Sequence, residues 1–454
     1  MAFSKYFETT FLQIEVLTIL REQMEKKLIL LVLAGTLLMT YVAGAAETGD
    51  LADENAKLKQ RVEKLDKEVE ELKKAVMQQD QPAAAALPRP ILSNLDIQLY
   101  GYLKLDAAYD DSRIDDGNFA KWVERENTNQ DDEQFNMTAN QSRFGMNITG
   151  PDNGEIKTSG RAEVDFYGGG SQNKAHLMMR HAYMQLDWPA DKFSILAGQT
   201  TDVISPLVPT TVNYSVCWWT GNIGYRRPQI RFTKVLGIDA DVDLKLEGAL
   251  ARTIGRGDEI GGTESGEDSA EPTLQGRASV TMPVFCSTPA TVGLSGHYGK
   301  EEYDIAVDGS DEDFRSWSLN VDMLQPVNNW LTIKGELFTG ENLDAYLGGI
   351  GQGVTIDVGA NRYDEIGSHG GWIAASLGPW GAERYNIGLA VDDVDRGDVD
   401  EGDRTLNRSV FANMFYAINK SAEFALELSH WKTDYAGNGD ADSFRIQTAF
   451  IYKF

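Results

Sequence analysis

Two adjacent arginines, Arg226 and Arg227, close a stretch whose composition differs from the rest of the chain. Residues 200–227 contain a single acid, Asp202, in a protein that is otherwise strongly acidic. The guanidinium group is a planar fork of N–H donors that matches the oxygens of carboxylates and phosphates. The stretch therefore has the chemistry to hold small anions. It is also rich in aromatic side chains, among them Trp218, Trp219 and Tyr225.

Signals for catalysis or metal binding are weak. The five histidines are scattered and have no metal-ligand spacing. The chain has no Gly-x-Ser-x-Gly nucleophile motif. The acidic run 392–403 lacks the glycine and glutamate positions of an EF-hand loop, so a solvated loop is the alternative to a Ca²⁺ site. We expect no enzyme activity, no cofactor and no metal, with Cys217 and Cys286 as free thiols.

Composition excludes several classes of protein. The chain has 454 residues and a formal net charge of −27, which opposes binding to nucleic acid. Two cysteines cannot form a disulfide scaffold. A mean hydropathy of −0.34 argues against a bundle of membrane helices. A membrane β-barrel, whose strands alternate apolar and polar residues, would not raise the mean hydropathy, so composition does not exclude this class.

The N-terminus has the pattern of a targeting segment. Lys26 and Lys27 precede an apolar run over 28–38, and the small residues 43–45 follow it. This predicts a signal peptide over 1–45, with Met24 as an alternative start codon. A membrane anchor is the other interpretation.

A heptad pattern follows the predicted signal peptide. Leucine recurs every seven residues at Leu51, Leu58, Leu65 and Leu72, which predicts a parallel coiled-coil helix over 46–80. A solvated single helix is the alternative. A linker rich in proline and alanine is predicted over 81–95.

From residue 96 the pattern alternates apolar and polar residues, which indicates β-strands with one charged face. A soluble sandwich would expose that charged face, whereas a membrane barrel would turn it towards a wet lumen. An even strand count, alternating short and long connections and a C-terminal strand ending in Phe454 favour the barrel. The expected fold class is all-β: a 16-stranded transmembrane antiparallel β-barrel over 96–454 with an N-terminal periplasmic coiled-coil helix. Strands are expected near 96–109, 138–149, 155–167, 176–188, 192–199, 228–235, 238–252, 273–282, 290–298, 314–324, 330–338, 370–378, 383–391, 408–418, 422–431 and 443–454.

Within such a barrel, residues 200–227 are expected to fold into the lumen as a constriction loop, because an extended apolar loop on a wet rim is costly. Packing against a neighbouring subunit is the alternative. Strand parity turns further bases inward, and each of them could form a cross-strand ion pair instead of contacting a solute. These inward bases are Arg143, Lys157, Arg161, Arg231 and Arg445.

Aromatic residues at predicted strand ends fit the girdles of a membrane barrel, although each could equally be ordinary packing. They are Trp188, Trp330, Trp372 and Trp431.

The chain resembles the DcaP-type trimeric porins. The resemblance lies in Gly198-Gln199-Thr200, Ser205-Pro206, the run 221–229 and the strand segment 141–145, together with the coiled coil before the barrel. It covers roughly residues 50–454 and implies a homotrimeric outer-membrane channel for small anionic solutes such as dicarboxylates. The cluster Cys217-Trp218-Trp219 is not expected of that family.

The leading hypothesis is therefore a passive diffusion channel in the outer membrane of a Gram-negative-type cell, with its helix in the periplasm. Its expected partners are its own copies, lipid, lipopolysaccharide and small anions, with peptidoglycan as a partner of the coiled coil. The alternative function is a structural anchor that tethers the envelope through that coiled coil. Almost all of the net negative charge falls in five predicted outer loops, at 110–134, 253–272, 299–313, 339–369 and 392–407.

Overall fold

The computed structural model describes residues 95–126, 132–150, 154–171, 174–255, 265–305, 310–357, 359–360 and 362–454. The predicted signal peptide, coiled coil and linker fall on residues 1–95 and lie, apart from Leu95, outside the described residues. No described helix is long and apolar enough to cross a membrane.

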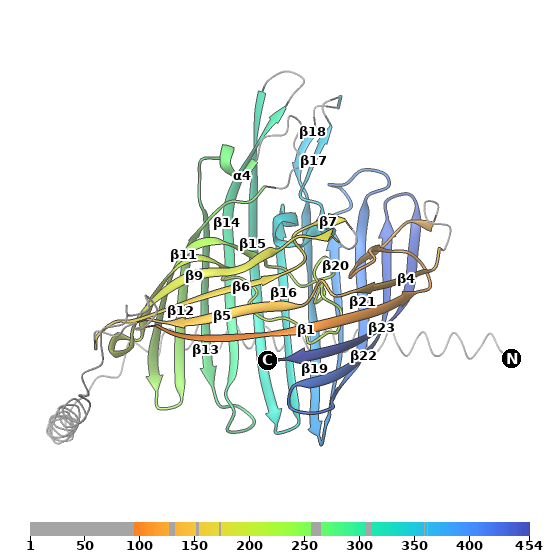
Figure 1. The fold of residues 1–454 in the computed structure, drawn as a ribbon. Coiled ribbons are helices and arrows are strands. Elements are labelled where there is room, and N and C mark those ends of the chain that lie inside the picture. The colour runs from red at the N-terminus through yellow and green to blue at the C-terminus, as the bar shows by residue number, and fades with distance from the viewer. Residues whose placement is uncertain are drawn as a thin grey trace, which may run out of the picture. The chain divides into compact units, whose positions relative to one another are not determined.

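The described residues form a closed antiparallel β-barrel of sixteen strands, in which β4 and β5 count as one interrupted strand (Figure 1). Each barrel strand pairs with the next one in the chain, and the last strand pairs with the first, from Tyr102 opposite Lys453 to Asp110 opposite Arg445. The barrel strands are β1 (Asp96–Asp110), the interrupted strand made of β4 (Gln134–Thr138) and β5 (Arg143–Thr149), β6 (Lys157–Asp165), β9 (Met178–Trp188), β10 (Phe193–Thr201), β11 (Arg226–Asp239), β12 (Val242–Ala251), β13 (Thr273–Met282), β14 (Ala290–Ile305), β15 (Ser310–Asn328), β16 (Leu331–Glu341), β19 (Gly367–Trp380), β20 (Glu383–Val394), β21 (Arg404–Ala417), β22 (Ala422–Tyr435) and β23 (Gly439–Lys453).

The alternation in sequence becomes an apolar outside and a polar inside. On β1, Leu99, Leu103 and Leu105 are 69%, 48% and 42% exposed, whereas Lys104 and Asp106 are 5% and 4% exposed. A soluble sandwich would bury the leucines and expose the charges. The opposite arrangement is that of a barrel whose outer face meets lipid and whose polar side chains fill the lumen. The prediction of a sixteen-stranded barrel is confirmed.

Strand ends differ from the prediction where polar residues continue the pairing. The strands expected at 290–298 and 314–324 extend as β14 and β15, with Lys300 opposite Arg315 and Glu302 opposite Asp313. Figure 1 shows this hairpin rising above most neighbouring strands. The strand expected at 138–149 is instead broken between β4 and β5, which both pair with β1.

The connections on one side of the barrel carry small elements of their own. They are the hairpins β2 (Ile114–Asp116) with β3 (Ala120–Val123), β7 (Gly170–Ser171) with β8 (Lys174–Ala175), and β17 (Val354–Asp357) with β18 (Arg362–Glu365), the 3₁₀ turns η2 (Asp344–Tyr346) and η3 (Gly349–Gly351), and the short helix α4 (Ser265–Asp268). On the opposite side, the 3₁₀ turn η1 (Pro189–Asp191) joins β9 to β10.

The expected aromatic girdle is only partly present. Trp330 is 45% exposed and lies 6.1 Å from the exposed ring of Trp380, measured between centroids. Trp372 and Trp431 are both buried, so their assignment to the girdle was wrong. Trp372 faces inward, where its indole N–H donates to Glu336 over 3.1 Å.

Candidate functional site

The segment 202–225 crosses the interior of the barrel, and strands on the far wall hold its backbone. The N–H of Leu207 donates to Glu336 on β16 over 2.7 Å, and that of Val212 donates to Glu427 on β22 over 2.6 Å. The ammonium group of Lys104 on β1 donates to the carbonyl of Val212 over 2.7 Å. We call residues 202–225 the constriction loop, because side chains on several strands fix it inside the lumen.

The aromatic residues of this loop are packed together inside the barrel. Tyr214 is 8% exposed, and Trp218 and Trp219 are each 7% exposed. Tyr214 stacks on Tyr167 with ring centroids 3.9 Å apart, and Phe119 stacks on Trp219 at 6.0 Å. Burying such rings stabilises the folded loop and narrows the interior.

Two further loops fold inward, which the sequence reasoning missed by treating them as acidic outer loops. In the first, which carries β2 and β3, the N–H of Ala120 donates to the Asn213 side chain over 3.1 Å. In the second, which carries η2 and η3, the carbonyl of Leu347 accepts a hydrogen bond from the N–H of Trp219 over 2.8 Å. The sequence feature that could have indicated the inward folding is the presence of large apolar residues in both loops, such as Phe119 and Tyr346.

Arg227 is paired with a buried carboxylate. Its Nε lies 2.8 Å from Asp202, and both side chains are 1% exposed. Its guanidinium also lies 3.9 Å from the ring centroid of Tyr346 and donates to the carbonyl of Ala345. This arginine joins the start of β11 to the constriction loop and to the loop of η2 and η3, so its geometry is that of a structural residue.

Arg226 differs from its neighbour. Its guanidinium lies 4.4 Å from the ring centroid of Tyr225 and 5.7 Å from that of Trp218. Within the described part of the chain no carboxylate pairs with it, and its buried Nε and Nη2 have no hydrogen-bond partner. The residue is 4% exposed. A buried guanidinium with unused donors has the chemistry to bind an anion.

Two of the predicted bases meet on one carboxylate. Arg143 Nε and Arg161 Nη2 lie 3.5 and 2.7 Å from Glu163. A third arginine, Arg180, lies 2.8 Å from Glu163 and 2.7 Å from Asp165, and sequence reasoning missed it. Three guanidinium groups thus face two carboxylates, which leaves this wall of the lumen with excess positive charge.

The remaining predicted bases are spread apart. Arg445 pairs with Asp110, since its Nη1 donates to both carboxylate oxygens over 3.0 and 2.9 Å. Arg231 lies 3.9 Å from Glu247, which Lys245 and Arg277 approach more closely, at 2.8 and 3.3 Å. Lys157 is exposed at the first residue of β6, in register with Asp187 at the end of β9 where the strands meet the short turns.

Two ionisable groups of the constriction loop, Tyr214 and Cys217, add no negative charge near Arg226. Burial raises the pKa of the Tyr214 phenol, and Asp165 raises it further, while Arg180 and Arg226 act in the opposite direction. Burial also raises the pKa of the Cys217 thiol. Both groups are neutral at physiological pH, so they add no charge to the constriction.

A family comparison decides the identity. Residues 40–262 match the family described as DcaP outer membrane protein. The chain belongs to the DcaP outer membrane protein family. The barrel is similar to the crystal structure of the outer membrane channel DcaP of Acinetobacter baumannii. That match has a TM-score of 0.66 and 18% sequence identity, and covers 82% of this chain and all of the other.

Two other solved barrels match this DcaP family member with lower TM-scores. An anion-selective porin from Comamonas acidovorans matches with a TM-score of 0.49 and 14% identity over 79% of this chain and all of the other. The OmpF porin of Salmonella typhi matches at 0.48 and 12% identity, over 79% of this chain and 97% of the other. No curated protein sequence is significantly similar to the chain.

Membership of the DcaP family places the protein in the outer membrane, in agreement with the apolar outer face of the barrel. Within the described residues of this DcaP-type barrel, no three His, Cys, Asp or Glu side chains form a metal site. Cys217 is buried and Cys286 half-buried, and both are free thiols. The expectation that the protein is not an enzyme stays a prediction.

Proposed function

We propose that the protein is a passive diffusion channel for small hydrophilic anions, such as dicarboxylates, and that it works as a homotrimer. The observation that carries this proposal is Arg226, at the end of the loop that crosses the lumen, whose guanidinium has no carboxylate partner among the residues that the structure describes. A fixed cation at a constriction lowers the free energy of a passing anion and raises that of a cation.

The neighbouring wall supports the same direction of selectivity. Arg143, Arg161 and Arg180 outnumber the two carboxylates that they share, so the region carries net positive charge. In a narrow space with low-dielectric walls, this charge concentrates anions. Glu336 on β16 and Glu427 on β22 also lie inside the barrel, but each accepts hydrogen bonds from the constriction loop and serves to hold it.

The distribution of charge along the channel also bears on the proposal. The outer loops are acidic, so an anion first meets a repulsive rim and then the arginines of the interior. Such a channel favours small, well-solvated anions over large polyanions, because repulsion at the rim grows with solute charge.

Planar-bilayer recording of the purified full chain tests the proposal. We expect stepwise conductance, with closures in groups of three if the unit is a trimer, and a reversal potential in a KCl gradient that shows preference for chloride. A barrel that inserts without conducting would contradict the proposal and favour the structural anchor.

A further inference from the structure

One wall of the barrel is interrupted at the depth of the membrane. Residues 139–142 separate β4 from β5 and lie opposite Leu103 and Leu105 of β1. These two leucines point outward and are 48% and 42% exposed, so the interruption lies within the apolar outer band of the barrel. The N–H of Ser142 donates to the carbonyl of Ala139 over 2.9 Å, which closes a turn between the two strands. We call the outward side of β1, β4, β5, β6 and β9 the interrupted wall.

The interruption also leaves β4 without a neighbour on one side. β5 pairs with β6, residues 144–149 running opposite 159–164. β4 pairs with β1, but within the described parts of the chain it has no register with β6. An unpaired strand edge presents backbone N–H and C=O groups that need partners.

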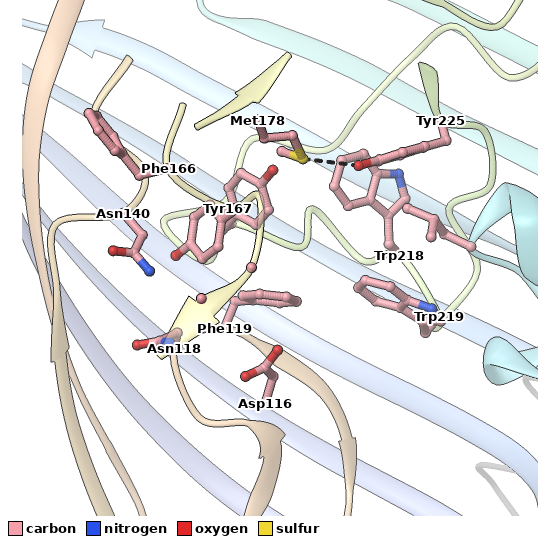
Figure 2. Close-up of a pocket in the computed structure, with 14 residues that line it drawn as sticks. Asp116, Asn118, Phe119, Asn140, Phe166, Tyr167, Met178, Trp218, Trp219 and Tyr225 are labelled. Carbon is pink, nitrogen blue, oxygen red and sulfur yellow. Dashed lines mark hydrogen bonds between the residues drawn. The ribbon is translucent and has the colours of Figure 1, made fainter. Parts of the chain in front are cut away.

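The inner side of the interruption faces a cavity, whereas its outer side faces the surroundings of the barrel. Asn140 lines a cavity of about 230 Å³ inside the barrel, together with Phe166 (Figure 2). On the outside Ala139 is exposed, and Phe135 and Met137 on β4 are 66% and 58% exposed. The hydrocarbon of a lipid bilayer offers no hydrogen bonds to irregular backbone or to a strand edge. At this depth the outer side is therefore better covered by protein than by lipid.

The strands and side chains of the interrupted wall support the same conclusion. β5 has 7 residues and β6 has 9, whereas β14 and β15 have 16 and 19. A transmembrane strand needs about 9–11 residues, so β5 is too short to cross a bilayer alone. Four outward methionines lie on this wall and are 37–58% exposed: Met137, Met146, Met179 and Met184. Methionine is enriched at the centres of protein interfaces.

The chain before β1 indicates which protein covers the wall. The leucine heptads over 46–80 predict a parallel helix that associates with its own copies. Only the predicted linker 81–95 separates this segment from β1, the first strand of the interrupted wall. Copies joined by the helix are therefore tethered at the start of β1, which favours contact through the wall that contains β1. The occupant is then a second copy of this chain and not an unrelated protein.

We infer that the interrupted wall is the surface through which the barrel binds further copies of this chain. The inference rests on the proposed function, which includes a homotrimer. In a closed ring of three, each copy offers two different parts of its surface to its two neighbours. The interrupted wall has two such parts. Leu99 on β1 protrudes and is 69% exposed, whereas Ala162 on β6 and Ala182 on β9 lie opposite each other and form a shallow surface that can receive it.

The mass of the full chain in detergent, measured by light scattering after size-exclusion chromatography, tests this assignment. Met137→Lys places a charge on the interrupted wall. The matched control is Leu319→Lys, which places the same charge at an outward position of β15 that is 51% exposed. We expect three chains per particle for the wild type and for the control, and a roughly threefold lower mass for Met137→Lys, because a buried unpaired charge opposes association.

A labelling experiment gives a second test that does not depend on the stability of the lysine variants. In a Cys286→Ser background, Met137→Cys and Leu319→Cys each supply one accessible thiol, because Cys217 is buried. We expect a maleimide to label the Met137→Cys variant about tenfold more slowly than the Leu319→Cys variant in the folded protein, because protein covers it. In urea the two rates should be equal.

Each outcome bears on the inference. A Met137→Lys variant with the wild-type mass, or equal labelling rates in the folded protein, would overturn it. A Leu319→Lys control that also dissociates would overturn it as well, because dissociation would then not depend on the interrupted wall. A wild type of one chain per particle would overturn both this inference and the homotrimer. An assembled trimer that never conducts would instead overturn the proposed channel and leave the interface in place.

Discussion

Arg227 and Asp202 form an ion pair at 2.8 Å in which both side chains are 1% exposed. Asp202 begins the constriction loop and Arg227 follows its end, so the pair closes the loop at its base. The second carboxylate oxygen of Asp202 accepts the backbone N–H of Tyr225 over 2.8 Å. The loop is thus held at its base, while the guanidinium of Arg226, one residue away, has no carboxylate partner among the described residues.

We predict that Asp202→Ala destabilises the barrel by about 3–5 kcal/mol, because it leaves the buried Arg227 cation without its partner. The measurement is the free energy of unfolding from urea titration in detergent, followed by tryptophan fluorescence. The matched control is Glu401→Ala, which removes a carboxylate paired with Arg396 at 3.1 Å on the exposed loop. Its cost should stay within about 1 kcal/mol. Equal costs for the two variants would contradict the structural role given to the pair.

Asn407 joins two of the inward loops. Its amide donates to the carbonyl of Lys121 over 2.7 Å and to that of Trp219 over 2.8 Å. We predict that Asn407→Leu, which removes both donors from a fully buried position, costs about 1–3 kcal/mol and loosens both loops. Single-channel recording should then show higher open-channel noise. An unchanged current trace would show that Asn407 does not hold the loops.

The two cysteines should differ sharply in reactivity. Cys217 is buried and its pKa is raised by burial, so its reactive thiolate is scarce at pH 8. Cys286 lies on a turn and is half-buried. We expect a maleimide to label Cys286 in the folded barrel within minutes, and Cys217 only after unfolding. Mass spectrometry of the Cys286→Ser variant checks this directly, and rapid labelling of that folded variant would contradict the packing of the constriction loop.

Strand positions were predictable because the side chains of each strand point alternately to lipid and to the lumen. The resulting alternation of apolar and polar residues is visible within the sequence of a single strand. Arg180 shows where this reasoning stops. The pairing of β6 with β9 shifts between Glu163 and Val164, and this bulge turns both Arg180 and His181 inward. Simple parity admits only one of two consecutive residues, so it left Arg180 out. A bulge depends on the partner strand, and the sequence of one strand does not reveal it.

The inward folding of two loops was missed for a similar reason. The loop of β2 and β3 is acidic overall, yet Ile114, Ala120 and Val123 are at most 1% exposed, against Trp431 and Tyr435 of β22. In the same way Tyr346 packs on the ring of His297, with centroids 3.9 Å apart. These contacts join residues that are far apart in the sequence, and average charge conceals the few apolar side chains that make them.

The partners of the inward arginines were also not predictable from the sequence. Sequence placed Arg143, Arg161, Arg226, Arg227 and Arg445 in one class of inward cations. The structure divides them by partner, because Arg227 and Arg445 each have a buried carboxylate within ion-pair distance, whereas Arg226 has none in the part of the chain that the structure describes. Which arginine is left unpaired depends on the distances between elements, and no spacing along the chain encodes it.

The reversal potential of Arg226→Ala in a tenfold KCl gradient tests the central claim most directly. The charge-matched control is Lys192→Ala at the turn between β9 and β10, where Lys192 is paired with Asp243 at 3.3 Å and 55% exposed. If Arg226 sets the selectivity, the wild type and the control prefer chloride, and the Arg226→Ala potential moves clearly towards zero. A cation-selective wild type, or an Arg226→Ala channel with the wild-type potential, would contradict the account.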